Sequence, residues 1–129
     1  MRERAYDFAN PKIRILAVNT VRLDDVIPPD EKIELIKLDL KSGEYHALLG
    51  AKDILKKRRP VLLFEAGHSS STHYRVTPAM IFDLLCTGLD YQLSTMGRWL
   101  THTPGFTCNE FIAAFDTDFF FMAYPATAR

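Results

Sequence analysis

The feature that most constrains this chain is a pair of short apolar runs separated by a stretch with helical periodicity. The first run is Leu35–Leu40 and the second is Val61–Phe64, and the carboxylates Asp39 and Glu65 stand at their ends. Between the two runs, apolar residues recur at helical spacing over residues 43–57. A strand, a helix and a second strand in this order predict a parallel crossover unit. Ligands of such a sheet bind at the carboxyl edge of its strands.

The rest of the chain predicts further strands and helices of an α/β fold. We expect residues 1–11 to be a loose N-terminal arm and residues 12–129 to form a single α/β domain. The predicted elements are a strand around Ile15–Arg22, a helix from Thr77-Pro78 to Gly88, a strand over Tyr91–Thr95, a short helix that starts at the capping box Thr107–Glu110 and runs through Phe115, and a final strand over Phe119–Tyr124.

Composition narrows the possible partners and the compartment. Sixteen basic residues balance sixteen acidic ones, so no overall field attracts nucleic acid or an anionic membrane. The basic run 56–59 falls at the end of the predicted helix, where cations suit the helix dipole. No apolar run approaches the ~20 residues of a membrane-spanning helix. Two cysteines, Cys86 and Cys108, are too few for a disulfide framework, so we expect a cytoplasmic protein.

Three patches of sequence carry a resemblance to a known family. Val21–Asp25 contains a short acidic "LDD" element, and Lys37–Ala51 is similar to the signature "KIDVEGAE…L.GA". Arg59–Glu65 reads "RPVLLFE". Together these patches resemble the FkbM-type methyltransferases, which transfer a methyl group from S-adenosylmethionine. The tail Asp118–Pro125 is similar to the closing strand of that family, so the resemblance spans roughly residues 16–125.

Two departures from the family pattern bear on the fold and the site. Lys41 and Ser42 stand where the family has an acidic residue followed by glycine. The glycine-rich turn that begins the family's cofactor site is absent, and too few residues precede Ile13 to hold it. The resemblance therefore implies the C-terminal half of a Rossmann-like methyltransferase domain: a mixed, incomplete sheet with helices on both faces. Its strand Leu35–Leu40 would have an unpaired edge, covered by the strand 15–22, by a second copy, or by a partner supplying the missing half.

The candidate site residues lie at the ends of the predicted parallel strands. The resemblance places S-adenosylmethionine near Asp39 and Leu40, with Asp39 orienting or deprotonating a hydroxyl; the alternative is a helix cap. Glu65 is a second catalytic candidate, as a base or a metal ligand, and otherwise a solvated strand end. His68 is a third, since it and His73 flank a serine-rich loop. A plain polar loop is the favoured interpretation there, and we predict no metal site.

Two functions remain open from sequence. The first is methyl transfer from S-adenosylmethionine to the hydroxyl of a small molecule or sugar, as the family resemblance implies. The second is a non-catalytic α/β association module, derived from a truncated or split methyltransferase. The absent glycine-rich turn and Lys41 favour the second function for this chain alone.

Overall fold

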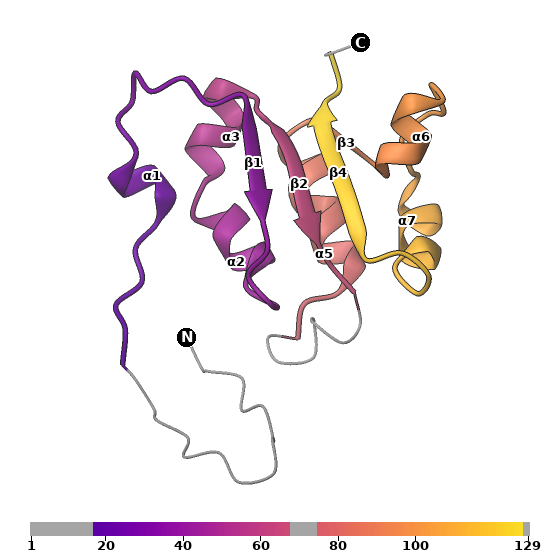
Figure 1. The fold of residues 1–129 in the computed structure, drawn as a ribbon, viewed down its shortest axis with the longest axis horizontal. Helices are drawn as coiled ribbons and strands as arrows, with labels where there is room; N and C mark the ends of the chain where they lie inside the picture. Colours follow the sequence, from indigo (N-terminus) through magenta and orange to yellow (C-terminus); the bar gives the residue numbers. More distant parts are fainter. Residues whose placement is uncertain (1–16, 68–74, 128–129) are drawn as a thin grey trace, which may run out of the picture.

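In this computed structural model, a four-stranded sheet with the order β1-β2-β4-β3 forms the centre of the molecule (Figure 1). The structure describes residues 17–67 and 75–127. The strands are β1 Leu35–Leu38, β2 Val61–Glu65, β3 Tyr91–Ser94 and β4 Phe120–Pro125. β1 and β2 are parallel, whereas β4 is antiparallel to both of its neighbours. The prediction of a mixed α/β fold is therefore confirmed.

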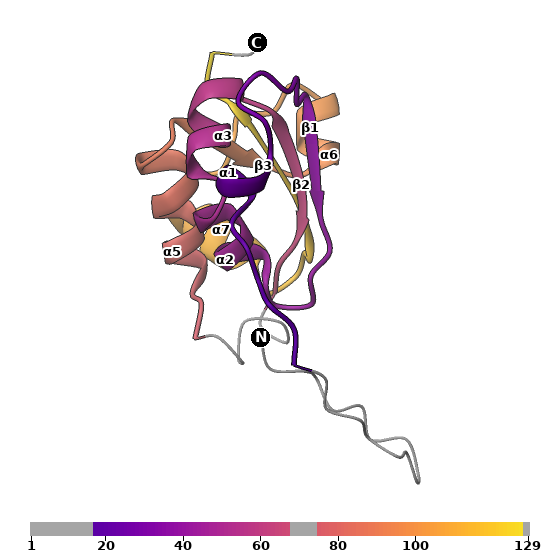
Figure 2. The same cartoon turned by 90° about the vertical axis from the view of Figure 1, so that its left-hand side faces the viewer.

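Helices cover the two faces of this sheet unequally. Figure 2 shows α2, α3, α5 and α7 on one side of the sheet and α6 on the other. The helical elements are α1 Leu23–Val26, α2 Glu44–Leu49, α3 Lys52–Arg58, α5 Pro78–Phe82, the π-helical turn η1 Asp83–Thr87, α6 Met96–Leu100 and α7 Cys108–Ala114. In the described part of the chain, none of them has the length and apolar character needed to cross a bilayer.

Alternation along the strands builds the core on the helical side. Leu62 and Phe64 of β2 are fully buried, and Phe64 lies beside Phe121 in the register of β2 with β4. Phe111 and Phe115 pack on the same ring, with centroids 5.0 Å and 6.0 Å from that of Phe121. These buried aromatic side chains remove a large apolar area from water, which makes this cluster a main source of stability.

Among the described residues, the other face of the sheet is covered only toward β3 and β4. Met122 and Tyr124 of β4 are buried there, while Leu35 of β1 is 55% exposed and Val61 and Leu63 are half-buried. The apolar side chains of β1 and β2 therefore lie partly open to solvent on this face.

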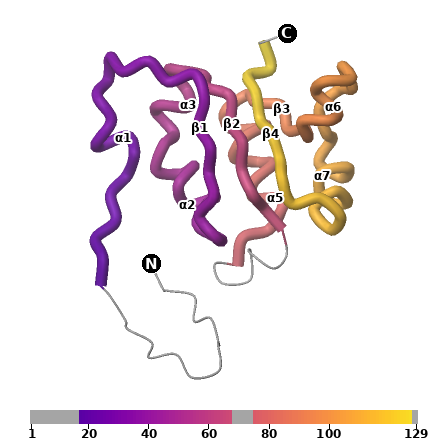
Figure 3. The backbone as a smooth tube through the Cα atoms, in the orientation of Figure 1, coloured from indigo at the N-terminus to yellow at the C-terminus, as the bar shows by residue number. Residues whose placement is uncertain are grey.

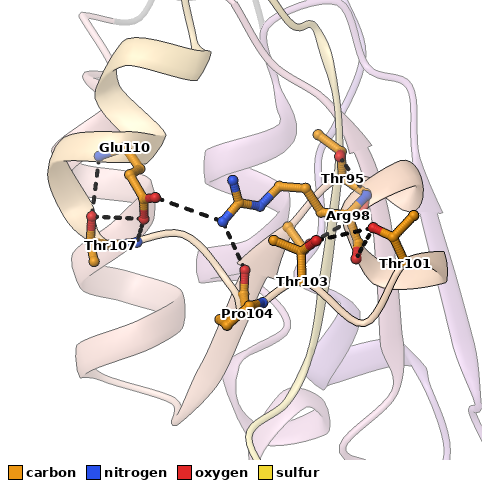
Figure 4. Close-up of polar contacts among 8 residues, drawn as sticks. Thr95, Arg98, Thr101, Thr103, Pro104, Thr107 and Glu110 are labelled. Atoms are coloured by element: carbon orange, nitrogen blue, oxygen red, sulfur yellow. Dashed lines mark hydrogen bonds and ion pairs between the residues drawn. The ribbon is translucent and has the colours of Figure 1, made fainter.

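A polar clasp joins α6 to α7 (Figure 4). The Arg98 guanidinium donates a hydrogen bond to the Pro104 carbonyl at 2.9 Å and lies 3.8 Å from Glu110. It also stacks on the Phe106 ring, 4.3 Å from the ring centroid. Thr107 and Glu110 form the predicted capping box at the start of α7. Thr107 holds the pKa of Glu110 below its ordinary value, because its backbone N–H and hydroxyl donate to the carboxylate.

The prediction of a strand around Ile15–Arg22 is wrong for residues 17–22, which are irregular and lead into α1. Val18 and Val21 are 63% and 71% exposed, and no strand of the described sheet pairs with this segment. Figure 3 shows the segment running past α2 to α1 instead. The apolar composition of this segment suggested a strand, but a strand also needs a neighbouring strand to pair with, and none of the described strands lies beside it. The predicted arm over residues 1–11 lies outside the described residues.

The single predicted helix over residues 43–57 is two helices, α2 and α3, with a break at Gly50 and Ala51. The start of α1 and its N-cap residue pack against this break: the Asp24 N–H donates to the Gly50 carbonyl at 2.9 Å, and a Cβ at Gly50 would lie 3.4 Å from the Arg22 Cα. The Asp24 carboxylate then accepts the N–H groups of Ile54 and Asp53 at 3.0 Å and 3.2 Å. A long-range cap therefore starts α3.

Three smaller differences have local causes. β1 ends at Leu38 rather than Leu40, since the Leu40 N–H is bound by Glu44. The helix that begins at Pro78 with Thr77 as its N-cap changes to a π-helical turn at Asp83 before it ends at Gly88. The sequence did not predict α6, whose N-cap is the side chain of Thr95.

Candidate functional site

The carboxyl edge of the two parallel strands carries a three-residue ion cluster. The Lys41 ammonium lies 2.6 Å from the Asp39 carboxylate and 2.8 Å from that of Glu65. Lys37 is a more distant partner of Asp39, at 3.8 Å. The topology thus brings both predicted carboxylates to one edge, with an ammonium group between them.

Lys41 controls the protonation of this cluster. Its hydrogen bond, and then its positive charge, hold the pKa of Asp39 below the ordinary value. In return, the two carboxylates raise the pKa of Lys41, Asp39 contributing most. All three side chains remain partly exposed, at 53% for Lys41, 39% for Asp39 and 30% for Glu65. Asp39 can therefore accept a hydrogen bond from a ligand at neutral pH, but it is a weak base.

The loop that aims Lys41 at the carboxylates is held by a buried acid. Lys41 and Ser42 have left-handed backbone, with φ of 48° and 96°. Glu44 is only 5% exposed, and its carboxylate accepts the N–H groups of Leu40 at 2.7 Å and Ser42 at 3.0 Å. Sequence reasoning missed this role, because an acidic residue in the first turn of a helix is common without one.

A groove of about 680 Å³ lies between β1, α2 and the segment that precedes α1. Its lining residues are Thr20, Val21, Arg22, Leu23, Ile36, Lys37, Leu38, Leu40, Gly43, His46, Ala47 and Gly50. Most of them are apolar, and the charged or ionisable members are basic. The sequence analysis did not predict this groove.

The remaining predicted site residues are distributed as follows. Leu40 lines the groove, whereas Asp39 belongs to the ion cluster and is not among the lining residues. His68 and His73 lie outside the described residues. Within the described ranges, no group of three or more His, Cys, Asp or Glu side chains is arranged to hold a metal ion. Burial raises the pKa of the Cys86 thiol to about 11.

Comparison with known proteins gives one match. A family model described as the methyltransferase FkbM domain matches residues 7–93, about two thirds of the 129-residue chain. The matched range contains α1, both parallel strands, the ion cluster and the groove, and it ends within β3. The resemblance of the tail after Leu93 lies outside this range. Searches among curated proteins and among solved structures found no match.

Proposed function

Since the chain belongs to the FkbM methyltransferase domain family, we propose that it serves methyl transfer from S-adenosylmethionine to a hydroxyl group of a small molecule or sugar. The family match carries the proposal. The placement of Asp39 and Glu65 supports it, because open α/β sheets bind ligands outside the carboxyl ends of their strands.

We further propose that the sheet corresponds to the C-terminal half of a Rossmann-like methyltransferase sheet. The parallel pair β1 and β2 lies at one side of the four-stranded order, and β1 is the edge strand. A complete doubly wound sheet would continue beyond β1 with further parallel strands. The edge position of β1 and the uncovered face near Leu35 agree with this assignment.

The described residues do not by themselves fit the whole cofactor. The groove is large enough for a small molecule, but it presents Arg22 and Lys37 and no carboxylate for ribose hydroxyls. Asp39 and Glu65 already share one ammonium, which disfavours a cationic sulfonium between them. Further contacts would have to come from residues outside the described ranges or from another subunit. We therefore assign no reaction step to the cofactor.

On the acceptor side, Asp39 and Glu65 have a defined task in this proposal. Each carboxylate has an exposed part that can accept a hydrogen bond from an incoming hydroxyl. Lys41 keeps Asp39 ionised and fixes its direction, so the pair orients the hydroxyl rather than removing its proton. Orientation of this kind contributes to rate by proximity.

Calorimetric titration of the full chain with S-adenosylhomocysteine tests the proposal. We expect saturable binding of S-adenosylhomocysteine, and in assays with a hydroxyl acceptor Asp39→Ala and Glu65→Gln should each lower kcat/KM for that acceptor at least tenfold. Asp90→Ala is the matched control, since Asp90 is 76% exposed and precedes β3 at the opposite end of the sheet. Addition of S-adenosylmethionine and candidate hydroxyl acceptors then identifies the product by mass.

A specific observation favours a second function, the non-catalytic association module. Lys41 neutralises much of the acidic edge, and β1 leaves its outer edge without a partner strand among the described residues. If the folded chain binds neither S-adenosylmethionine nor S-adenosylhomocysteine in the calorimetric titration, the association module is favoured over methyl transfer.

A further inference from the structure

A small cavity lies at the same end of the sheet as the ion cluster. Figure 1 shows the starts of α2 and α5 at this end, where β1 and β2 finish. Lys41 is followed in the chain by Ser42, and Glu65 by Ala66, and both of these following residues line the cavity. The cavity therefore adjoins the place where the acceptor is proposed to bind. Its lining residues are Ser42, Glu44, Tyr45, Ala66, Gly67, Val76, Ile81 and Phe115.

Two polar side chains belong to this largely apolar lining. Ser42 and Glu44 are each only 5% exposed. The Ser42 hydroxyl oxygen is buried and has no hydrogen-bond partner in the described part of the chain. Each carboxylate oxygen of Glu44 accepts one backbone N–H and has capacity for a further hydrogen bond. A buried hydroxyl without a partner is costly, so these two groups point to a ligand that satisfies them.

The backbone at Ser42 agrees with this interpretation. Its φ of 96° lies in the left-handed region, which glycine adopts without strain and serine does not. Strained residues of this kind cluster at functional sites. Serine at this position costs conformational energy and adds a hydroxyl that has no partner in the described part of the chain, which favours a use for that hydroxyl.

The cavity admits a group of limited size and defined chemistry. Its volume of about 20 Å³ holds roughly one non-hydrogen atom. The Glu44 carboxylate needs a hydrogen-bond donor and repels an anion, whereas the Ser42 hydroxyl can donate or accept. A hydroxyl group donates one hydrogen bond and accepts another, so a single hydroxyl satisfies both side chains.

We propose that Ser42 and Glu44 bind a second hydroxyl group of the methyl acceptor, which makes that acceptor a polyhydroxyl compound rather than a simple alcohol. The inference rests on the proposed function, in which Asp39 and Glu65 orient the hydroxyl that is methylated. Successive residues of an extended chain point to opposite faces, so Glu65 and the cavity-lining Ala66 lie on the two sides of one edge. An acceptor at this edge contacts the ion cluster with one hydroxyl and the cavity with another.

Nuclear magnetic resonance of the full chain tests this subsite without the cofactor. We expect glycerol and methyl glucoside to shift the N–H signals of Leu40 and Ser42, which Glu44 binds. At equal concentration 1-propanol, which has the three carbons of glycerol and one hydroxyl, should shift them less. Ser42→Gly keeps the fold, because glycine adopts this backbone, and should weaken the binding of both polyols about fivefold through loss of one hydrogen bond. The matched control Thr101→Ala removes an exposed hydroxyl at the end of α6 and should leave their affinity unchanged.

Three results would overturn the inference. If neither polyol shifts these signals, or if Ser42→Gly leaves the affinity for the polyols unchanged, the cavity takes up water only. If ammonium chloride shifts the signals more than glycerol at equal concentration, the cavity is a cation site. Titration with S-adenosylhomocysteine separates this inference from the proposed function. Binding of that compound without the polyols keeps methyl transfer and removes the subsite, whereas binding of the polyols alone keeps a polyol site and removes methyl transfer.

Discussion

At the carboxyl edge of the sheet, Lys41 governs the charge state of Asp39. Because the hydrogen bond from Lys41 is the main cause of the lowered Asp39 pKa, Lys41→Met should raise that pKa toward 3.8. Carbon-13 NMR of the carboxyl group measures it, with Lys52→Met on α3 as the control. An unchanged Asp39 pKa would show that the ion pair does not form in solution.

The same pKa sets the sign of a pH effect on stability. The folded-state pKa of Asp39 is depressed, so its stabilising contribution is present above the unfolded value and is lost as the pH falls through the folded value. As the pH falls below the unfolded value of 3.8, wild type should therefore lose more stability than Lys41→Met. Urea denaturation between pH 7 and pH 3 compares the two, and parallel curves would contradict the role of Lys41.

Glu44 is the residue on which the Lys41 loop depends. Glu44→Ala leaves the part-buried N–H of Leu40 and the buried N–H of Ser42 without their acceptor, at a cost of about 2 kcal/mol in the free energy of unfolding. Glu44→Gln keeps one acceptor oxygen and should cost about half as much. Chemical denaturation measures both, and Glu34→Ala, at an exposed position, is the control. Equal stability of all three variants would exclude the capping role.

At the scale of elements, Asp24 joins α1 to α3. Its side chain is 4% exposed and accepts two N–H groups of the first turn of α3. Asp24→Ala should lower the free energy of unfolding by about 1.5 kcal/mol, as loss of a helix cap does. The neighbouring exposed Asp25 gives the control Asp25→Ala, which should change little. If Asp25→Ala lowered the free energy of unfolding more than Asp24→Ala, Asp24 would not be the residue that caps α3.

Elements that depend on nearby residues could be predicted from the sequence, and those that depend on distant ones could not. The apolar runs of β1 and β2, the Thr77 cap and the Thr107–Glu110 capping box are local patterns, and the structure confirms them. The break between α2 and α3 depends on Asp24, about 30 residues away, so local periodicity predicted one continuous helix. The segment 17–22 was misassigned for the same reason.

The candidate site also has one part that the sequence predicted and one part that it did not. Parallel strands end at a common edge, which was enough to place Asp39 beside Glu65. The position of the ammonium between them follows from left-handed backbone at Lys41 and Ser42. Side chains such as these rarely adopt that conformation, and no sequence pattern here indicated it. The groove likewise required the path of the segment before α1.

The Asp24 carboxylate also protects two amide hydrogens of α3 from exchange with solvent. First-turn N–H groups of a helix have no intrahelical acceptor and ordinarily exchange with solvent quickly. Those of Asp53 and Ile54 are bound by a carboxylate from a segment far away in the sequence. Their exchange with deuterium is therefore limited by release of the segment around α1, and these two signals report how often that segment leaves the body of the protein.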